Sequence, residues 1–181
     1  MGKRIPGNLR VVFTEQQIRH RIRQLAQQIN RAYQGKTLHI VGASDDCFLF
    51  MADLIRALRV PIVCHFVNTL IRATSVEGIP VQEIFYSPAL DLADKDVLLL
   101  SGIVYSGVTL DFLYRQILAK GPKSIRTASL IEKPEDRKVD VVMDYLAFKA
   151  TSTGGQFLVG YGLGHQGHYR NLRCIAALAQ G

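Results

Sequence analysis

The segment best suited to chemistry lies in the middle of the chain, where small and hydroxyl residues follow an apolar run. Val97–Leu100 is continuously apolar, as expected for a parallel strand buried on both faces. Within the segment Tyr105–Thr109 that follows, Ser106 and Thr109 supply hydroxyl donors, and Gly107 precedes a predicted helix. A strand that turns into a helix N-terminus directs backbone N–H groups and the positive end of the helix dipole at one point. The segment therefore predicts an anion site; the alternative is an ordinary turn that binds nothing.

The elements that must position this segment alternate between strand and helix. Thr14 and Gln17 have capping-box spacing before a helix with one apolar stripe, which consists of Ile18, Ile22, Leu25 and Ile29. Residues 68–90 are predicted to form a hairpin or mobile loop. Alternation without repeats or linkers predicts one α/β domain over residues 1–181, with a mostly parallel sheet between helices. The predicted strands are 38–41, 62–67, 97–100, 124–131, 141–147 and 157–160, with helices over 48–58 and up to Lys120, and a final apolar piece over 174–178.

Composition narrows the class of protein. The chain has 181 residues, 48% of them hydrophobic, and a net charge of +7. Residues 1–36 hold eight basic residues and one acid, so this N-terminal arm and helix carries the whole net charge. Nucleic acid or a protein could contact this segment, although a solvated helix face explains the charge equally well. Three scattered cysteines argue against disulfides and zinc and favour a cytoplasmic protein, and no apolar run is long enough to span a membrane.

Several further motifs carry a resemblance that extends over most of the chain. They are Phe50–Leu58, Ala128–Pro134, Asp144–Phe148, Phe157–Leu163 and Tyr169–Leu172, in this order. Together with the segment from Ser101 to Thr109, they resemble the motifs of the purine (hypoxanthine-guanine) phosphoribosyltransferases.

The resemblance implies a type I phosphoribosyltransferase fold, a homodimer or homotetramer, and a purine base or nucleotide as ligand. It assigns the purine to Lys133, Phe157 and the Leu158 backbone, and pyrophosphate to Arg170. It assigns the 5′-phosphate to Tyr105, Ser106, Gly107, Val108 and Thr109. There are alternatives to these two purine-binding roles. Lys133 could be a solvated residue of a turn, and Phe157 could be an ordinary residue of the hydrophobic core.

Departures from the family pattern fall on the catalytic positions. Ser101 and Gly102 stand where the family has two adjacent acids that hold the ribose hydroxyls and magnesium. Tyr105 stands at the position of the general base, and Gly164 replaces another magnesium ligand. A tyrosine titrates near pH 10 and is a poor base at neutral pH. The sequence therefore predicts no resident metal site.

The loop that binds pyrophosphate in the family also differs. Gly42–Cys47 lacks the family's lysine and contains Asp45 and Asp46, which would repel a polyanion. Either carboxylate could instead cap the next helix. The family's lid has no counterpart at Asn68–Leu70.

Four interpretations remain open from the sequence. The first is a phosphoribosyltransferase-like protein that binds a GMP- or IMP-type nucleotide, with weak or no transfer. The second is an active purine-salvage enzyme with an altered site. The third is another reaction on the same fold, for which the sequence offers His39, His65, His165 and His168. The fourth is a regulator that binds nucleic acid through residues 1–36.

Overall fold

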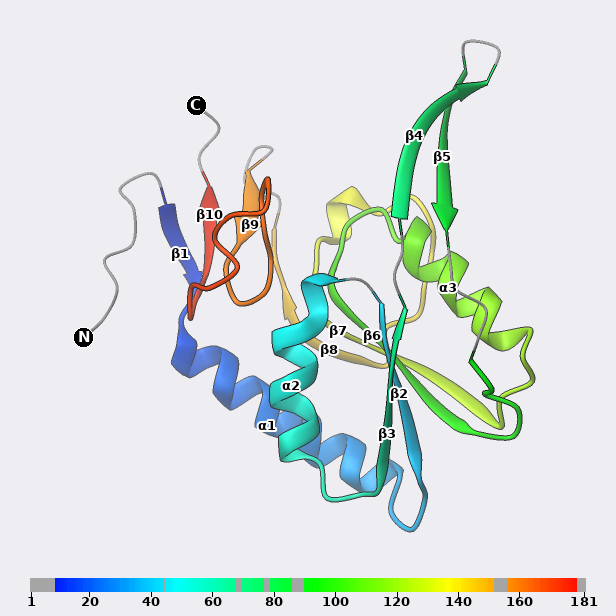
Figure 1. Ribbon diagram of the computed structural model, residues 1–181. Coiled ribbons are helices and arrows are strands. Elements are labelled where there is room, and N and C mark those ends of the chain that lie inside the picture. Colours follow the sequence, from blue (N-terminus) through cyan, green and yellow to red (C-terminus); the bar gives the residue numbers. More distant parts are fainter. Residues whose placement is uncertain are drawn as a thin grey trace.

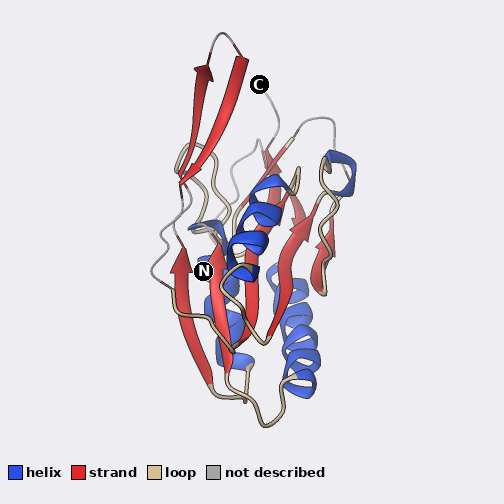
Figure 2. Cartoon of the chain, turned by 90° about the vertical axis from the view of Figure 1, so that its right-hand side faces the viewer, coloured by secondary structure: helices blue, strands red, loops and turns tan. Residues whose placement is uncertain are grey.

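The computed structural model describes residues 9–43, 45–67, 70–76, 79–85, 90–151 and 156–178. Its centre is a sheet of five parallel strands in the order β3-β2-β6-β7-β8. The arrows of this sheet all point toward one end of the molecule in Figure 2. The strands are β2 (Leu38–Ala43), β3 (Ile62–Val67), β6 (Asp96–Val104), β7 (Ser124–Glu132) and β8 (Tyr145–Lys149).

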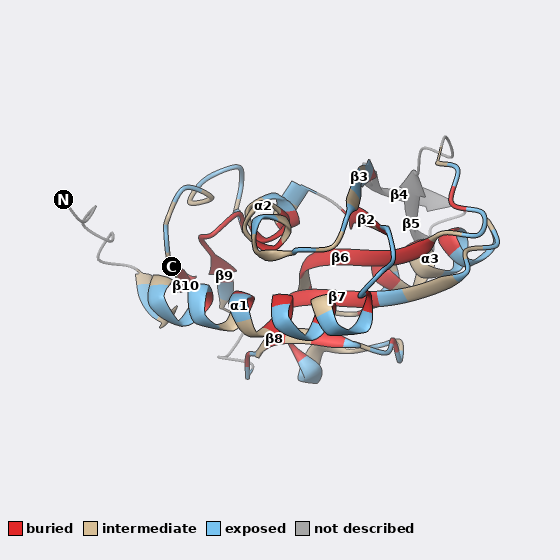
Figure 3. Ribbon diagram, turned by 90° about the horizontal axis from the view of Figure 1, so that it is seen from below, coloured by how far each residue is buried: buried red, intermediate tan, exposed pale blue. Residues whose placement is uncertain are grey.

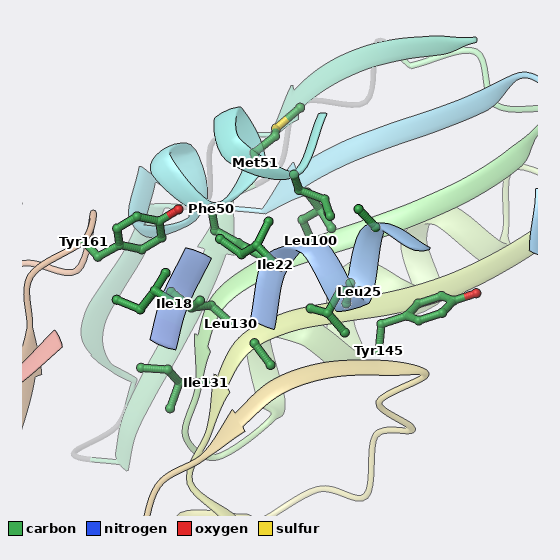
Figure 4. Close-up of a cluster of buried hydrophobic side chains, with 14 of the residues drawn as sticks. Ile18, Ile22, Leu25, Phe50, Met51, Leu100, Leu130, Ile131, Tyr145 and Tyr161 are labelled. Atoms are coloured by element: carbon green, nitrogen blue, oxygen red, sulfur yellow. The ribbon is translucent and has the colours of Figure 1, made fainter. Parts of the chain in front are cut away.

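Helices cover both faces of the central sheet, as predicted (Figure 1). On β6, Leu98 and Leu100 pack in a core with α1 (Glu15–Ala32) and α2 (Phe48–Ala57), part of which Figure 4 shows. The alternate residues Val97 and Leu99 pack with α3 (Val108–Leu118) in a second core. Because successive side chains of a strand point to opposite faces, a continuously apolar strand serves both cores. Figure 3 shows β6 and β7 as predominantly buried strands.

Helix α1 forms as its sequence predicts. The Thr14 hydroxyl oxygen accepts a hydrogen bond from the Gln17 backbone N–H at 3.3 Å, and the Gln17 side chain accepts from the Thr14 N–H at 2.8 Å. The predicted stripe faces the core, and its four members are at most 3% exposed. Arg21 lies at the edge of this face and donates to the carbonyls of Leu146 and Ala147 on β8, at 2.9 Å each. Arg21, one of the basic residues of the N-terminal segment, therefore connects α1 to the edge strand β8. Residues 1–8 lie outside the described part of the chain.

A second sheet contains a strand that the sequence analysis did not predict. β1 (Leu9–Phe13) pairs antiparallel with β10 (Ile175–Leu178), which pairs in turn with β9 (Phe157–Val159). The sequence indicates only a basic arm for the residues before Thr14. Strand β1 forms because the chain returns more than 160 residues later with a complementary edge, and no local pattern reveals such a partner.

The hairpin and strand β8 can be compared with the residue ranges predicted for them. β4 (Leu70–Val76) and β5 (Ile79–Phe85) form the predicted antiparallel hairpin, which projects beyond the sheet in Figure 1. Whether it is mobile stays a prediction, and residues 68, 69, 77, 78 and 86–89 lie outside the described part. The strand predicted over 141–147 begins only at Tyr145, after Asp144 has accepted hydrogen bonds from Thr127. None of the helices in the described residues is long and apolar enough to cross a membrane.

Candidate functional site

The turn between β6 and α3 has the geometry of an anion site. β6 ends at Val104, and Gly107 caps α3 with a φ of +81°, a conformation that glycine adopts without strain. The Ser106 hydroxyl oxygen accepts a hydrogen bond from the Val108 N–H at 3.4 Å. Gly107 has no side chain to cap the helix, so the first turn of α3 can receive an anion from outside.

A neighbouring segment holds this turn in place. The Ser106 carbonyl accepts hydrogen bonds from the backbone N–H groups of Lys138 and Val139, at 2.9 and 3.1 Å. A Cβ on Gly107 would lie 2.9 Å from the Val139 carbonyl oxygen, so the two segments touch through backbone. The shape of the turn therefore depends on contacts that span more than 30 residues of sequence.

Arg137 lies behind the same turn and was missed by the sequence analysis. Its Nη1 would be 3.0 Å from a Cβ on Gly107, and its Nε lies 3.5 Å from the Glu132 carboxylate. Nη2 donates to the Val141 carbonyl, while the buried Nη1 has no hydrogen-bond partner among the described residues. A largely buried guanidinium thus places positive charge behind the anion site. The dense charge of residues 132–140 is the one local signal of this arrangement in the sequence.

The turn forms one wall of a cavity of about 550 Å³. The opposite wall comes from the β2–α2 connection and from the loop after β9. The lining residues from the two walls and the cavity floor are Ala43, Asp45, Asp46, Ser101, Ile103, Val104, Tyr105, Ser106, Gly107, Thr109, Leu110, Leu113, Leu158, Leu163, Gly164 and Arg170.

Tyr105 extends away from the anion site toward the region assigned to the purine. The Lys133 Nζ lies 5.1 Å from the centroid of its ring, within the range of a cation–π interaction. Burial raises the pKa of the Tyr105 hydroxyl to about 12, and the charges of Asp46 and Asp136 act in the same direction. A hydrogen bond from the Leu158 backbone opposes this shift. The phenol is therefore protonated at neutral pH and lies between two residues expected to bind a base.

Lys133 is buried, which excludes the alternative that it is a solvated lysine of a turn. It is 5% exposed and follows directly after β7. Its Nζ lies 2.7 Å from the Asp136 carboxylate, across a short 3₁₀ turn over Pro134–Asp136. The spacing of three residues between Lys133 and Asp136 was visible in the sequence, but its meaning depends on this turn. Lys133 is thus held in place by Asp136 and by the Tyr105 ring.

Phe157 and Leu158 occupy different environments on β9. Phe157 is 45% exposed, so it is not a buried core residue, which was the alternative to purine binding. Its ring centroid lies 4.5 Å from that of His165. An exposed aromatic face can receive a planar ring by stacking. Leu158 is 5% exposed and lines the cavity. His165, one of the four histidines considered for another reaction, thus contacts Phe157.

Arg170 is engaged by the wall that faces the anion site. Its Nη2 lies 2.8 Å from the Asp45 carboxylate, and its Nη1 donates to the Gly162 carbonyl at 2.7 Å. A Cβ on Gly164 would lie 2.8 Å from the Arg170 Nε, so the guanidinium fills the space of a side chain at that position. Asp45 therefore neutralises the arginine that the resemblance assigns to pyrophosphate.

The carboxylates after β2 do not cap the next helix. Asp45–Cys47 forms a 3₁₀ turn, and α2 has Cys47 at its N-cap without a side-chain cap. The N-cap alternative is therefore wrong, because the extra turn displaces both carboxylates from the capping position. Both line the cavity instead, and Asp46 packs against Gly102.

The described residues do not form a prearranged magnesium site. No three His, Cys, Asp or Glu side chains gather there in a way that could hold a metal ion. Asp45 is already paired with Arg170, and Ser101 is 7% exposed and donates to the Ile103 carbonyl at 3.3 Å. Magnesium prefers charged oxygen ligands, and this set does not supply an open group of them.

Two of the four histidines considered for other chemistry form a pair elsewhere. His39 Nδ1 and His65 Nε2 lie 3.1 Å apart on β2 and β3, and neither residue lines the cavity. Burial lowers the pKa of both rings. His168 is exposed, and its ring meets Tyr169 edge-on. These histidines therefore do not combine with Asp45 and Asp46 into one acid–base site.

Comparison with known proteins connects this geometry to a family. Residues 12–164 match the phosphoribosyl transferase domain. A hypoxanthine-guanine phosphoribosyltransferase from Dictyostelium discoideum is 32% identical over 174 residues, covering 94% of this chain and 95% of the relative. The structure of a Bacillus anthracis hypoxanthine-guanine phosphoribosyltransferase is 30% identical, with a TM-score of 0.79 over 93% of this chain and 97% of the other. A Trypanosoma cruzi hypoxanthine phosphoribosyltransferase mutant, complexed with the product IMP, is 29% identical, with a TM-score of 0.85 over 97% and 93%.

Proposed function

Because the chain belongs to the phosphoribosyltransferase family and has its type I fold, we propose that it binds a purine nucleoside monophosphate of the GMP or IMP type, with weak or no phosphoribosyl transfer. The observation that carries this proposal is the β6–α3 turn. Gly107 in the left-handed region opens the N-terminus of α3, with the hydroxyls of Ser106 and Thr109 beside it and the Arg137 guanidinium behind. This combination suits the dianionic 5′-phosphate of a nucleotide.

The residues that adjoin Tyr105 and Leu158 of the cavity wall favour a 6-oxopurine as the base. The Lys133 ammonium can donate to an exocyclic carbonyl oxygen, and the exposed Phe157 ring offers a surface for stacking. A 6-amino group in the same place would confront the ammonium with another donor. We therefore expect GMP and IMP to bind more tightly than AMP.

Phosphoribosyl transfer is expected to be weak because the cavity lacks groups that would assist it. A phenol with a pKa of about 12 cannot accept a proton from the purine at neutral pH. The Ser101 hydroxyl is turned toward the Ile103 carbonyl, and Asp45 competes with pyrophosphate for Arg170. These features reduce general-base catalysis and pyrophosphate binding, while they leave the phosphate turn intact.

The second candidate is an active purine-salvage enzyme with an altered site. Its specific support is the position of Asp45 and Asp46, whose carboxylates line the cavity rather than cap α2. Carboxylates in the cavity can stabilise a cationic, sugar-like transition state. Turnover at the rates of ordinary salvage enzymes would favour this candidate.

A binding titration and a turnover assay test the proposal together. We expect calorimetry to show binding of GMP and IMP, with guanosine and AMP at least about ten-fold weaker because each loses one charge-assisted interaction. Incubation with guanine or hypoxanthine, phosphoribosyl pyrophosphate and magnesium should yield little nucleotide. Absence of binding to GMP and to IMP would remove the proposal.

A further inference from the structure

A second cavity, of about 530 Å³, lies between helices α1 and α2 and the loop after β9. We call it the α1–α2 cavity. Figure 1 shows these two helices side by side. The α1–α2 cavity is similar in volume to the cavity beside the β6–α3 turn but shares no lining residue with it. Its volume lies within the range of small-molecule sites, and nothing in the proposed function makes use of it.

Four arginines line the α1–α2 cavity, and they come from three separate parts of the chain. Arg19 and Arg23 lie one turn apart on α1 and therefore project from the same face of the helix. Arg56 comes from α2, and Arg173 comes from the loop before β10. Helix α1 belongs to the N-terminal segment that carries the net charge of the chain. The fold therefore gathers part of that charge around a cavity.

The acids of the lining are fewer than the arginines, and both are already engaged. Two guanidiniums share the Glu15 carboxylate, which lies 2.5 Å from Arg19 and 3.5 Å from Arg173. Asp53 forms an ion pair with Arg56. Four arginines and two acids leave the lining with a formal charge of +2. The α1–α2 cavity is therefore an electropositive cavity whose charge the protein itself does not balance.

Arg23 is the arginine that takes part in none of these pairs. It is exposed, and its side chain has no ion pair or hydrogen bond among the described residues. A guanidinium presents its N–H donors in a planar fork that matches two oxygens of one phosphate. A phosphate monoester carries close to two negative charges at neutral pH. One such group would therefore balance the charge of the lining and supply acceptors for Arg23.

Part of the lining is apolar. Leu49, Ala57 and Leu172 line the cavity and are only partly buried, so a ligand can contact them. The Tyr161 ring lies beside α2 in Figure 4, and its hydroxyl donates to the Asp53 carboxylate at 2.5 Å. Inorganic phosphate would leave the apolar surface in contact with water, whereas an apolar group attached to the phosphate would cover it. The lining therefore favours an organic phosphate over an inorganic one.

The other arginines of α1 do not extend this arrangement into a track for nucleic acid. Arg21 donates to carbonyls of β8, and Arg31 lies in the last turn of the helix, outside the cavity. Proteins that bind a nucleic-acid strand without sequence preference use a positively charged groove that follows its backbone. Arginines gathered around one cavity suit a small molecule instead.

We propose that the α1–α2 cavity binds a small organic phosphate. The phosphate meets the guanidiniums that line the cavity, foremost that of Arg23, and an aromatic or aliphatic body covers Leu49, Ala57 and Leu172. The inference goes beyond the proposed function and does not depend on it, because the two cavities are lined by different residues.

The test uses 1-naphthyl phosphate as the probe, with 1-naphthol and inorganic phosphate to represent its two parts. Calorimetry at low ionic strength should show the probe bound at least about ten-fold more tightly than either part. Arg23→Gln should weaken binding of the probe about five- to twenty-fold, because one charge-assisted interaction is lost. Arg31→Gln is the matched control. It removes one exposed arginine from the same helix but outside the cavity, and it should leave binding within about two-fold.

A further variant separates this cavity from the β6–α3 turn, which is proposed to hold the 5′-phosphate of a nucleotide. Gly107→Ala alters that turn and should leave the Arg23-dependent binding of the probe within about two-fold. Thermal unfolding of each variant confirms that it is folded.

Four results would overturn the proposal. The protein could fail to bind the probe, Arg23→Gln could bind it as tightly as the unaltered protein, or Gly107→Ala could abolish its binding. The fourth result is an equal loss in Arg31→Gln and Arg23→Gln, which would indicate a diffuse basic surface of the kind that binds nucleic acid.

Discussion

The two walls of the cavity present their polar groups in different ways. On the β6–α3 wall, the anion site consists of backbone N–H groups, one glycine and two hydroxyls, held by backbone contacts to Lys138 and Val139. On the opposite wall, charged side chains pair within the protein, as Asp45 does with Arg170. Backbone geometry tolerates most side-chain replacements, whereas a site made of charged side chains can be neutralised by one substitution. The β6–α3 wall can therefore keep its anion site while the charged side chains of the opposite wall change.

The largest effect should come from the glycine that shapes the backbone-built wall. Gly107→Ala places a methyl group 2.9 Å from the Val139 carbonyl oxygen, in a residue with a φ of +81°. We expect GMP binding to weaken about ten- to hundred-fold and the free energy of unfolding to fall by about 1–3 kcal/mol. Calorimetry with GMP and denaturant unfolding measure the two effects.

Gly121→Ala is the matched control for this change. Gly121 also has a positive φ, of +67°, but a Cβ there would meet nothing within 4 Å. The substitution should cost roughly 1 kcal/mol of stability through backbone strain alone and leave GMP binding within about two-fold. Equal losses of GMP binding in the two variants would show that strain, not the shape of the turn, determines binding.

An intermediate effect is expected where the two walls meet, at Tyr105. Its ring lies against Lys133 and its hydroxyl against the Leu158 backbone, so a base must displace the phenol before it binds. We expect Tyr105→Ala to strengthen GMP binding up to about ten-fold, because an interaction of about 1 kcal/mol with Lys133 no longer has to be broken.

Tyr105→Phe separates the two contacts of the phenol. It keeps the ring under Lys133 but removes the hydrogen bond from Leu158, so its GMP affinity should lie between those of the unaltered protein and Tyr105→Ala. Weaker binding in Tyr105→Ala than in the unaltered protein would show instead that the phenol supports the base.

The smallest effect should come from the exposed ion pair of the charged wall. Asp45→Asn releases Arg170, and we expect affinity for pyrophosphate to rise by about two- to five-fold while stability changes by less than about 1 kcal/mol. Asp111→Asn is the control, since it breaks the exposed pair with Arg115 on α3, whose atoms also lie 2.8 Å apart. An equal gain in both variants would indicate general electrostatics rather than release of Arg170.

The sequence predicts the elements whose signals are local. The apolar stripe and capping box of α1, the strands β2, β3, β6 and β7, and the glycine turn before α3 all follow from short patterns of residues. The strand β1 and the late start of β8 do not, because each depends on a partner far away in the chain. At the site, resemblance to a family predicts residues such as Lys133 and Phe157, which no local pattern indicates.

What the sequence did not predict at the site was the pairing among its own side chains. Nothing local indicates that the Tyr105 ring lies under Lys133, or that Arg137 lies behind Gly107. The contact between Asp46 and Gly102 joins a 3₁₀ turn to a strand 56 positions further along the chain. Such contacts arise from the way in which the carboxyl ends of parallel strands converge, and that convergence appears only in three dimensions.

The tight fit of Asp46 against Gly102 and Gly162 has a consequence for how this site can change through mutation. An acid introduced at position 102 would meet the backbone of residue 46, so the altered protein would have difficulty folding before any new chemistry could be selected. The reverse order is open, because shortening or moving the segment 45–47 first leaves room for a side chain on β6. The accessible routes between the two arrangements are therefore unequal, and a descendant that regains a strand carboxylate must first give up the one in the loop.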